Sequence, residues 1–144
     1  MKKIIFLCTG NSCRSQMAEG FAKEMLKDKN HIVQSAGVMP DTLNEIAILV
    51  MKEEGIDISS QYSKKIETFD LGSFDIVVTV CDKAKGYCPV VKHVNLLHYS
   101  FYDPVLATGT KNQKLIVYRK VRDQIKTMVN NLLLNYNILC QETN

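Results

Sequence analysis

An eight-residue stretch from Cys8 to Ser15 stands between two segments with different hydrophobic patterns, and its position constrains how this chain can fold. Residues 2–7, before it, end in an unbroken apolar run that is typical of a buried β-strand. Residues 16–26, after it, carry apolar side chains at intervals of three and four, which is typical of a helix. The stretch is therefore predicted to be a strand-to-helix turn in which several backbone N–H groups converge on one point.

The residue types in this turn predict an anion site that contains a nucleophile. N–H groups at the positive end of a helix favour an oxyanion, and we expect Gly10 to supply any positive φ that the turn needs. The guanidinium of Arg14 can bind two oxygens of a tetrahedral oxyanion. Cys8 stands at the mouth of the turn, where the pKa of its thiol is expected to fall from about 8.5 to about 4–7. These groups suit covalent attack on a phosphate-like centre; the alternative is a buried cysteine in an ordinary turn.

The length and charge of the chain limit the classes of protein to which it can belong. Its 144 residues suffice for one domain with a sizeable core, and its 46% hydrophobic and 23% charged residues are typical of a soluble globular protein. The net charge of +3 suits an anionic substrate but is too small to indicate nucleic-acid binding. No apolar run approaches the ~20 residues of a membrane span. The N-terminus lacks a signal-peptide cleavage pattern, so we expect a cytoplasmic protein without a membrane partner.

Alternating patterns along the rest of the chain predict an α/β fold. Helices are expected over 15–27, 43–54 and 112–136, with a short one within 66–72; strands are expected over 31–37, 74–80 and 92–96; loops are expected over 82–89 and 98–109. Strands that alternate with helices form right-handed βαβ units. We therefore expect a single catalytic domain over 1–136, with a parallel sheet of about four strands flanked by helices on both faces, and a C-terminal tail over 137–144.

Five cysteines, an odd number in a chain without an export signal, indicate thiol chemistry rather than a framework of structural disulfides. Cys8 follows the first predicted strand, and Cys81 follows the strand expected over 74–80. The carboxyl ends of parallel strands share one edge of the sheet, and ligands bind at that edge. We therefore expect these two thiols to lie close together.

Cys88 stands seven residues after Cys81, and three interpretations of this pair are open. A zinc site would combine both thiols with His93 and His98, although the paired short spacings of zinc modules are absent. A redox relay needs a nucleophilic thiol, an acceptor and a resolving thiol. Gly86 gives the predicted loop the freedom to bring the two Cα atoms within the roughly 7 Å of a disulfide. The third interpretation is two incidental cysteines.

The segment Cys8–Gly20, with the sequence CTGNSCRSQMAEG, resembles the active-site loop of two groups of enzymes that share a fold. These are the low-molecular-weight protein tyrosine phosphatases and the thioredoxin-coupled arsenate reductases, and the segment is more similar to that of the reductases. The segments Ser35–Gly37, Gly55–Ser59 and Val77–Cys81 also resemble the reductases. The resemblance extends from Lys3 to about Val129 and implies a low-molecular-weight phosphatase-like fold.

This resemblance implies that the chain reduces arsenate to arsenite by a relay of three thiols. Cys8 would attack arsenic, and Cys81 and then Cys88 would act as resolving thiols. Asp103 stands in an Asp-Pro dipeptide like that of the general-acid loop in both groups, and it would protonate the leaving oxygen; elsewhere such a dipeptide is most often a plain turn. Arg14 would hold the oxyanion. The expected oxyanion-binding residues are Thr9, Gly10, Asn11, Ser12, Cys13, Arg14 and Ser15.

The same resemblance implies which molecules the protein meets. Reduced thioredoxin would be the electron donor, with no bound cofactor and no metal, and phosphate or sulfate would bind as mimics of arsenate. We expect a monomer without a nucleic-acid partner. The alternative is a low-molecular-weight tyrosine phosphatase, which hydrolyses phosphate monoesters through a phosphocysteine. The pair Cys81 and Cys88 is absent from the phosphatases and therefore favours the reductase.

The sequence departs from the reductases at several positions. Lys64 stands where the reductases that bind potassium carry an acidic residue, in a cation site that would involve Asn11, Glu19 and Ser35. Tyr102 replaces the acidic residue that precedes the general acid, and in this respect the chain is closer to the phosphatases.

Overall fold

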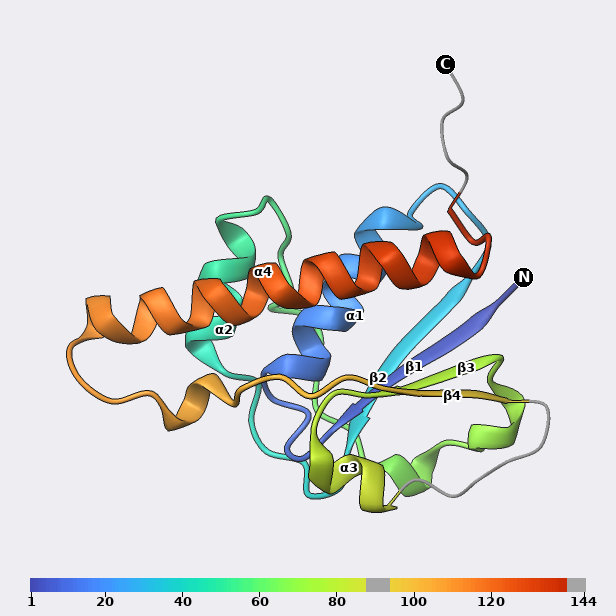
Figure 1. Ribbon diagram of the computed structural model, residues 1–144, viewed down its shortest axis with the longest axis horizontal. Coiled ribbons are helices and arrows are strands. Elements are labelled where there is room, and N and C mark those ends of the chain that lie inside the picture. Colours follow the sequence, from blue (N-terminus) through green and yellow to red (C-terminus); the bar gives the residue numbers. More distant parts are fainter. Residues whose placement is uncertain (88–93, 140–144) are drawn as a thin grey trace.

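The structure is a computed structural model that describes residues 1–87 and 94–139 (Figure 1). Cys88, His93 and Cys140 lie outside the described residues. The strands are β1 (Lys3–Cys8), β2 (Ile32–Gly37), β3 (Ile76–Thr79) and β4 (Asn95–His98). The α-helices are α1 (Arg14–Met25), α2 (Glu45–Lys52), α3 (Asp82–Tyr87) and α4 (Lys111–Asn135), and short 3-10 helices are η1 (Ile66–Thr68), η2 (Leu71–Ser73) and η3 (Pro104–Leu106).

The four strands form one parallel sheet in the order β2-β1-β3-β4. β1 lies between β2 and β3, with Cys8 opposite Gly37 and Leu7 opposite Thr79. In the view of Figure 1, α1 and α4 lie above the strands and α3 lies below them. The predicted α/β fold with a four-stranded parallel sheet is confirmed. The strand order places the carboxyl ends of β1, β2 and β3 side by side.

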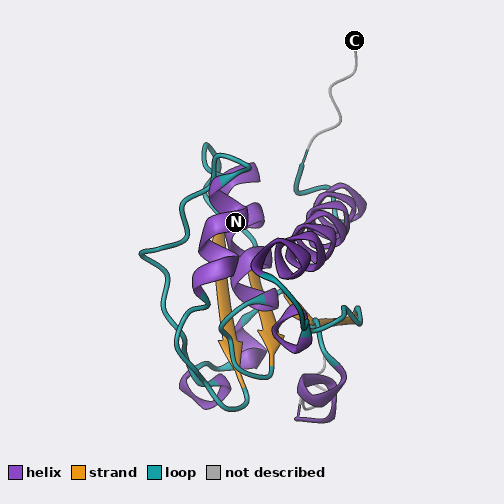
Figure 2. Cartoon of the chain, turned by 90° about the vertical axis from the view of Figure 1, so that its left-hand side faces the viewer, coloured by secondary structure: helices purple, strands orange, loops and turns teal. Residues whose placement is uncertain are grey.

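The core forms where α1 packs on the sheet and α4 packs on α1 (Figure 2). The apolar run Ile4–Leu7 of β1 is 0% exposed, as expected for a central parallel strand with both faces covered. Met17 and Phe21 of α1 stand four residues apart on one helix face and are almost completely buried. Burial of each such side chain contributes about 1.5–3 kcal/mol, so this layer holds β1 and α1 at a constant separation.

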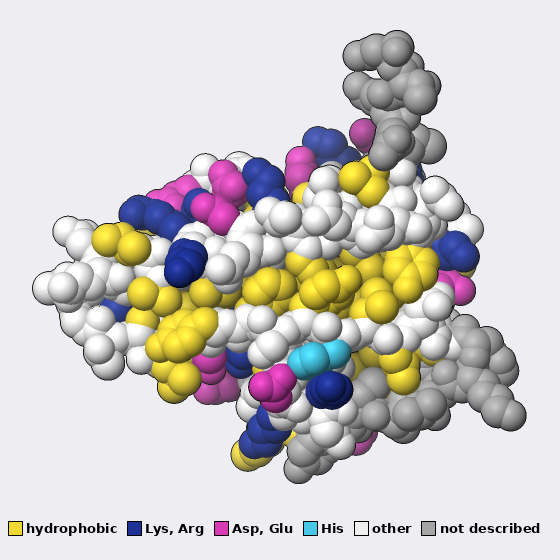
Figure 3. All heavy atoms as spheres, in the orientation of Figure 1, with side chains coloured by type: hydrophobic (Ala, Val, Ile, Leu, Met, Phe, Trp, Pro, Cys, Tyr) yellow, Lys and Arg dark blue, Asp and Glu magenta, His cyan; other side chains and the backbone are white. Residues whose placement is uncertain are grey.

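The last helix, α4, is tied to the rest of the molecule by its cap and by ion pairs. The hydroxyl of Thr110 accepts the N–H of Gln113 at 3.2 Å, and Gln113 Oε1 accepts the N–H of Thr110 at 2.7 Å. Arg119 donates to both carboxylate oxygens of Glu53, at 3.0 and 2.7 Å, at the end of α2. In Figure 3, acidic and basic side chains mix along the upper edge, and apolar side chains form a band across the middle. This face therefore carries no single-sign patch.

The segment after β3 is a helix, where the sequence predicts a loop over 82–89. α3 begins directly after Cys81, whose Sγ accepts the N–H of Ala84 at 3.4 Å and whose carbonyl accepts the N–H of Lys85 at 3.2 Å. Gly86 weakens the helical pattern of this segment by about 1 kcal/mol. The side chain of Ala84 is 0% exposed, and this tertiary burial outweighs the low local propensity.

The fourth strand lies later in the chain than predicted. The pattern predicts a strand over 92–96, whereas β4 is Asn95–His98, so that His98 belongs to the sheet rather than to a loop. The N–H of Asn95 donates to the carbonyl of Asp75 at 3.1 Å, and the N–H of Tyr99 donates to the carbonyl of Thr79 at 2.9 Å. Pairing with the buried strand β3 determines where β4 begins and ends, and the local β-propensity of the sequence does not reveal this pairing. The other strands and α-helices begin and end within two residues of the prediction.

Gly37→Ala is expected to lower the free energy of unfolding by about 1–3 kcal/mol. A Cβ at Gly37 would lie 2.7 Å from the backbone nitrogen of Asn11 and 2.8 Å from the carbonyl oxygen of Thr9, so the turn after β1 would have to move. Gly86→Ala is the control, because a Cβ there meets nothing within 4 Å and alanine favours a helix. Urea denaturation measures both variants, and equal losses of stability would contradict the close packing at Gly37.

Candidate active site

The turn between β1 and α1 lies against the chain that leaves β2. The N–H groups of Met39 and Asp41 donate to the carbonyl oxygens of Thr9 and Gly10, at 2.9 and 2.8 Å. These bonds continue the pairing of β1 with β2 beyond the ends of both strands. They hold the turn in one conformation at the carboxyl edge of the sheet, beside the first residues of α1.

Asn11, not Gly10, has the positive φ in this turn, at 48°. The prediction for Gly10 is therefore wrong, because asparagine also adopts the left-handed region when its side chain finds partners. Asn11 is 0% exposed, and its Oδ1 accepts the N–H of Lys64 at 2.9 Å. Its carbonyl oxygen accepts Gln16 Nε2 at 2.9 Å and Ser63 Oγ at 2.8 Å. These contacts stabilise a conformation that a glycine would leave free.

The hydrogen bonds of Asn11 leave the hydroxyl of Ser15 able to donate to Cys8. Asn11 Nδ2 donates one proton to Ser15 Oγ and the other to Ser35 Oγ, each at 2.8 Å. Since Ser15 Oγ already accepts this proton, its own O–H is free to donate to Cys8 Sγ, at 2.7 Å. The backbone N–H of Asn11 donates to the same sulfur at 3.2 Å. Two donors directed at Cys8 Sγ favour the thiolate over the thiol.

Burial nevertheless raises the pKa of the Cys8 thiol, and it is the largest influence on that pKa. Hydrogen bonds with Ser15 and the positive charge of Arg14 act in the opposite direction and lower it. This direction is opposite to the lowering that the sequence predicts, because Cys8 is only 2% exposed and burial disfavours the charged thiolate. Burial also raises the pKa of Cys13, where only the charge of Arg14 acts in the opposite direction and no hydrogen bond with Ser15 does.

Ser15→Ala should raise the pKa of Cys8 further, because it removes a hydrogen bond that favours the thiolate. Only the thiolate is alkylated, so the increase of rate with pH should move to higher pH, and the rate at pH 7 should fall about tenfold per unit of pKa. The measurement is the rate of Cys8 alkylation by iodoacetamide as a function of pH. Ser12→Ala, at another hydroxyl beside the pocket, is the control. Identical pH profiles for the two variants would contradict the role assigned to Ser15.

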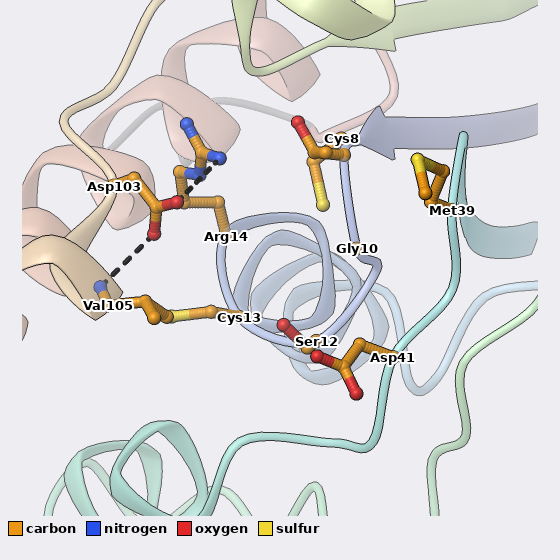
Figure 4. Close-up of a pocket in the computed structure, with 10 residues that line it drawn as sticks. Cys8, Gly10, Ser12, Cys13, Arg14, Met39, Asp41, Asp103 and Val105 are labelled. Carbon is orange, nitrogen blue, oxygen red and sulfur yellow. Dashed lines mark hydrogen bonds and ion pairs between the residues drawn. The ribbon is translucent and has the colours of Figure 1, made fainter.

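Arg14 and Asp103 meet on one wall of the site. Arg14 Nη2 lies 3.4 Å from Asp103 Oδ2, and Arg14 Nη1 donates to the carbonyl of Phe101 at 3.1 Å. Asp103 Oδ1 accepts the N–H of Val105 at 3.1 Å, at the start of η3 (Figure 4). The segment after β4 therefore places the carboxyl group of Asp103 directly beside the guanidinium of Arg14.

A pocket of about 280 Å³ opens above the turn. Its lining residues are Cys8, Thr9, Gly10, Ser12, Cys13, Arg14, Met39, Asp41, Asp103 and Val105. In Figure 4 the sulfur of Cys8 points into the space between Arg14 on one side and Met39 on the other. The expected oxyanion-binding residues Asn11 and Ser15 are not among the lining residues; both are 0% exposed and act on the pocket through Cys8.

Sequence reasoning missed three lining residues, Met39, Asp41 and Val105. A signal for the first two was available, because the carboxyl end of β2 was expected at the same edge as that of β1. Val105 gives no such signal, because only the fold of the segment after β4 brings it to the pocket. Asp41 adds a second carboxylate to the wall opposite Asp103, as Figure 4 shows.

Cys81 lies beside this pocket, two residues after the end of β3. Its sulfur is 3.2 Å from Thr9 Oγ1, and the residue is 4% exposed. A negative charge on Cys81 would raise the pKa of Cys8. Cys81 thus contacts the residue that follows Cys8, and the close approach of the two thiols stays a prediction. The third thiol of the predicted relay, Cys88, lies outside the described residues.

A second network lies behind the turn and joins Glu19 with Ser35, Lys23 and Lys64. Glu19 is 1% exposed; its Oε1 accepts Ser35 Oγ at 2.6 Å and lies 3.7 Å from Lys64 Nζ. Its Oε2 accepts Lys23 Nζ at 2.6 Å. Burial lowers the pKa of Lys64, and the charge of Glu19 raises it. Two ammonium groups thus balance one buried carboxylate that contacts Asn11 through Ser35.

Within residues 1–87 and 94–139, no three His, Cys, Asp or Glu side chains are grouped so that they could hold a metal ion. The zinc interpretation of Cys81, Cys88, His93 and His98 depends on two residues outside those ranges. None of the helices described there has an apolar stretch long enough to cross a membrane.

Known proteins share this combination of fold and turn. Residues 3–143 match the family of low molecular weight phosphotyrosine protein phosphatases, and the chain belongs to this family. It is 50% identical over 125 residues to an arsenate reductase of Bacillus subtilis (strain 168), covering 86% of this chain and 89% of that protein. It is 51% identical over 126 residues to an arsenate reductase of Shouchella clausii (strain KSM-K16), covering 86% and 90%.

A solved structure of an arsenate reductase in the phosphate binding state is 38% identical. The match covers 94% of this chain and 98% of that chain, with a TM-score of 0.76. Within its family, the chain therefore belongs with the arsenate reductases.

Proposed function

We propose that this protein reduces arsenate to arsenite by a relay of Cys8, Cys81 and Cys88. The observation that carries the proposal is the second thiol beside the first: Cys81 Sγ lies 3.2 Å from the hydroxyl of Thr9, the residue that follows Cys8. Hydrolysis of a phosphocysteine requires only water, whereas reduction requires a thiol at this place. Identity of about half of the aligned residues to arsenate reductases supports the same reaction here.

In the first step, arsenate binds in the pocket with its oxygens toward the turn and the start of α1. Arg14 supplies positive charge to these oxygens. The thiolate of Cys8 attacks arsenic and an S–As bond forms. One As–OH bond breaks, and the hydroxyl leaves as water after it takes a proton from the protonated carboxyl group of Asp103. Arsenic is still As(V) after this step. Arg14 and Asp103 lie 3.4 Å apart and both line the pocket, so one oxyanion can contact both groups.

In the second step, the thiolate of Cys81 attacks the sulfur of Cys8. The Cys8–Cys81 disulfide forms and the S–As bond breaks. The electron pair of that bond stays on arsenic, which becomes As(III) and leaves as arsenite. The thiolate of Cys88 then attacks Cys81, so the disulfide passes to Cys81–Cys88 and the thiolate of Cys8 is restored. Two thiols have then supplied the two electrons that arsenic gained.

Reduced thioredoxin completes the cycle in this proposal. One of its thiolates attacks the Cys81–Cys88 disulfide, and the second thiolate releases the mixed disulfide, which leaves thioredoxin oxidised and this protein reduced. Both electrons come from thiols, so the reaction needs no bound cofactor. Phosphate and sulfate share the tetrahedral shape of arsenate and would bind the same pocket as competitors.

Oxidation of NADPH in the presence of thioredoxin and thioredoxin reductase tests the proposal. We expect the oxidation to require this protein, arsenate and thioredoxin together, with one arsenite formed for each NADPH consumed. Replacement of thioredoxin by glutathione and glutaredoxin is the matched control. Turnover in that control would show that glutathione and glutaredoxin, rather than thioredoxin, can supply the electrons. Rapid hydrolysis of an aryl phosphate without any arsenate-dependent oxidation would favour the phosphatase.

A further inference from the structure

We infer that His98 is a positioning residue for the resolving thiol Cys81. The inference rests on the proposed relay and adds to it a group that acts through the backbone on either side of the thiol. His98 is the last residue of β4. Its imidazole connects Thr79, at the end of β3, with Asp82, at the start of α3, across the bend formed by Val80 and Cys81.

The two ring nitrogens of His98 contact partners on different elements. Nδ1 lies 2.7 Å from Thr79 Oγ1, and Nε2 lies 2.9 Å from Asp82 Oδ1. Thr79 is 4% exposed, whereas the side chains of His98 and Asp82 are 22% and 81% exposed. One end of this bridge is therefore anchored in the sheet, and the other is a solvent-facing contact to α3. An imidazole can make both contacts at once because each ring nitrogen forms a hydrogen bond.

Backbone hydrogen bonds from β4 and from the chain that follows it hold the residues before Cys81. Thr79 and His98 are opposite one another in the pairing of β3 with β4. The N–H of Tyr99 donates to the carbonyl of Thr79 at 2.9 Å, and the N–H of Phe101 donates to that of Val80 at 3.4 Å. The side chain of His98 adds a contact on the other side of Cys81, to Asp82, the first residue of α3.

The orientation of α3 matters because it directs the sulfur of Cys81. Cys81 Sγ lies 3.2 Å from Thr9 Oγ1 and accepts the N–H of Ala84, a residue of α3, at 3.4 Å. A rotation of α3 would move the N–H of Ala84 and turn the sulfur away from Thr9 and Cys8. Displacement at a sulfur requires the attacking thiolate to be aligned, and a misplacement of about 1 Å can cost on the order of a hundredfold in rate.

The test measures how fast the Cys8–Cys81 disulfide forms after reduced protein is mixed with arsenate. A Cys88→Ser background stops the relay at this disulfide, which is counted by mass spectrometry after acid quenching and alkylation. We expect His98→Ala to slow its formation about tenfold. Asp82→Ala should slow it about two- to fivefold, because an exposed contact is worth less than about 1 kcal/mol. His98→Gln can still donate to Asp82 and should recover part of the rate.

Two controls separate positioning from general damage. His31→Ala is the matched variant, because His31 lies at the opposite end of the sheet, where its Nδ1 accepts the N–H of Lys2 at 2.9 Å. Aryl phosphate hydrolysis, which uses Cys8 but not Cys81, should be unchanged in His98→Ala. The double variant of His98 and Asp82 should be no slower than His98→Ala, because both changes break one bridge.

The outcomes distinguish this inference from the proposed function. A His98→Ala protein that forms the disulfide as fast as its parent, or that loses aryl phosphate hydrolysis in parallel, overturns the inference. If His98→Ala does not fold, Asp82→Ala decides, because its exposed side chain can be removed without damage to the core, and an unchanged rate there overturns the inference. A parent protein that forms no Cys8–Cys81 disulfide with arsenate refutes the relay itself.

Discussion

Cys8→Ser is expected to abolish both arsenate reduction and aryl phosphate hydrolysis, with a loss of about a thousandfold or more in each. Both reactions begin with a bond from this sulfur to the central atom of the oxyanion. Serine keeps the shape of the side chain and the contacts with Ser15 and the N–H of Asn11, but its hydroxyl does not ionise in this site. The measurements are arsenite release with thioredoxin and nitrophenol release from an aryl phosphate.

Cys13→Ser is the matched control for this prediction. It makes the same substitution in the same turn, at a thiol that is as buried as Cys8 but forms no bond to arsenic in the proposed mechanism. We expect this variant to keep most of both activities. Activity that survives in Cys8→Ser would refute covalent catalysis by Cys8, and an equal loss in Cys13→Ser would show that the turn, rather than the nucleophile, had been damaged.

Cys81→Ser and Cys88→Ser should each stop repeated turnover with thioredoxin while leaving aryl phosphate hydrolysis intact. The reason is that both thiols act only after the first covalent step, and hydrolysis ends with water instead of a second thiol. The expected loss in steady-state NADPH oxidation is again about a thousandfold, because no other route back to the reduced enzyme is available.

Single-turnover yields separate the two variants from one another. Arsenic is reduced when Cys81 attacks Cys8, so Cys81→Ser should release no arsenite, whereas Cys88→Ser should release one equivalent and then stop with a Cys8–Cys81 disulfide. Arsenite is measured after quenching, and the disulfide by mass spectrometry. If both variants turn over like the unaltered protein, the relay is wrong and the phosphatase gains support.

Most of the fold follows from local patterns in the sequence. The apolar run of β1, the helical spacing of α1 and the long amphipathic pattern of α4 each predict their element within two residues. The exceptions are α3 and β4, where packing decides. Ala84 is buried against the sheet, and β4 takes its register from β3. Contacts of this kind join residues far apart in the chain, so local propensity cannot reveal them.

The candidate active site likewise has features that the sequence predicts and features that only the tertiary structure sets. The sequence alone determined which reactive groups meet in the turn, because a strand followed at once by a helix brings Cys8 and Arg14 to one anion site whatever surrounds them. The parallel topology predicted from the sequence also brought Cys81 to that edge. Only the tertiary structure decided that Asn11 rather than Gly10 takes the positive φ, and that Asp41 and Val105 complete the pocket.

The pKa of Cys8 shows most clearly why some properties of the site cannot be predicted from the sequence. Its lowering by Ser15 and Arg14 is a property of eight neighbouring residues and can be read from the sequence. Its raising by burial is larger and depends on how the chain after β2 and the segment after β4 close around the sulfur. The sequence by itself thus determined which thiol we propose as the nucleophile and which residues are its nearest partners. The tertiary structure decided its contact with water, because desolvation sums over all atoms near in space and not over those near in the chain.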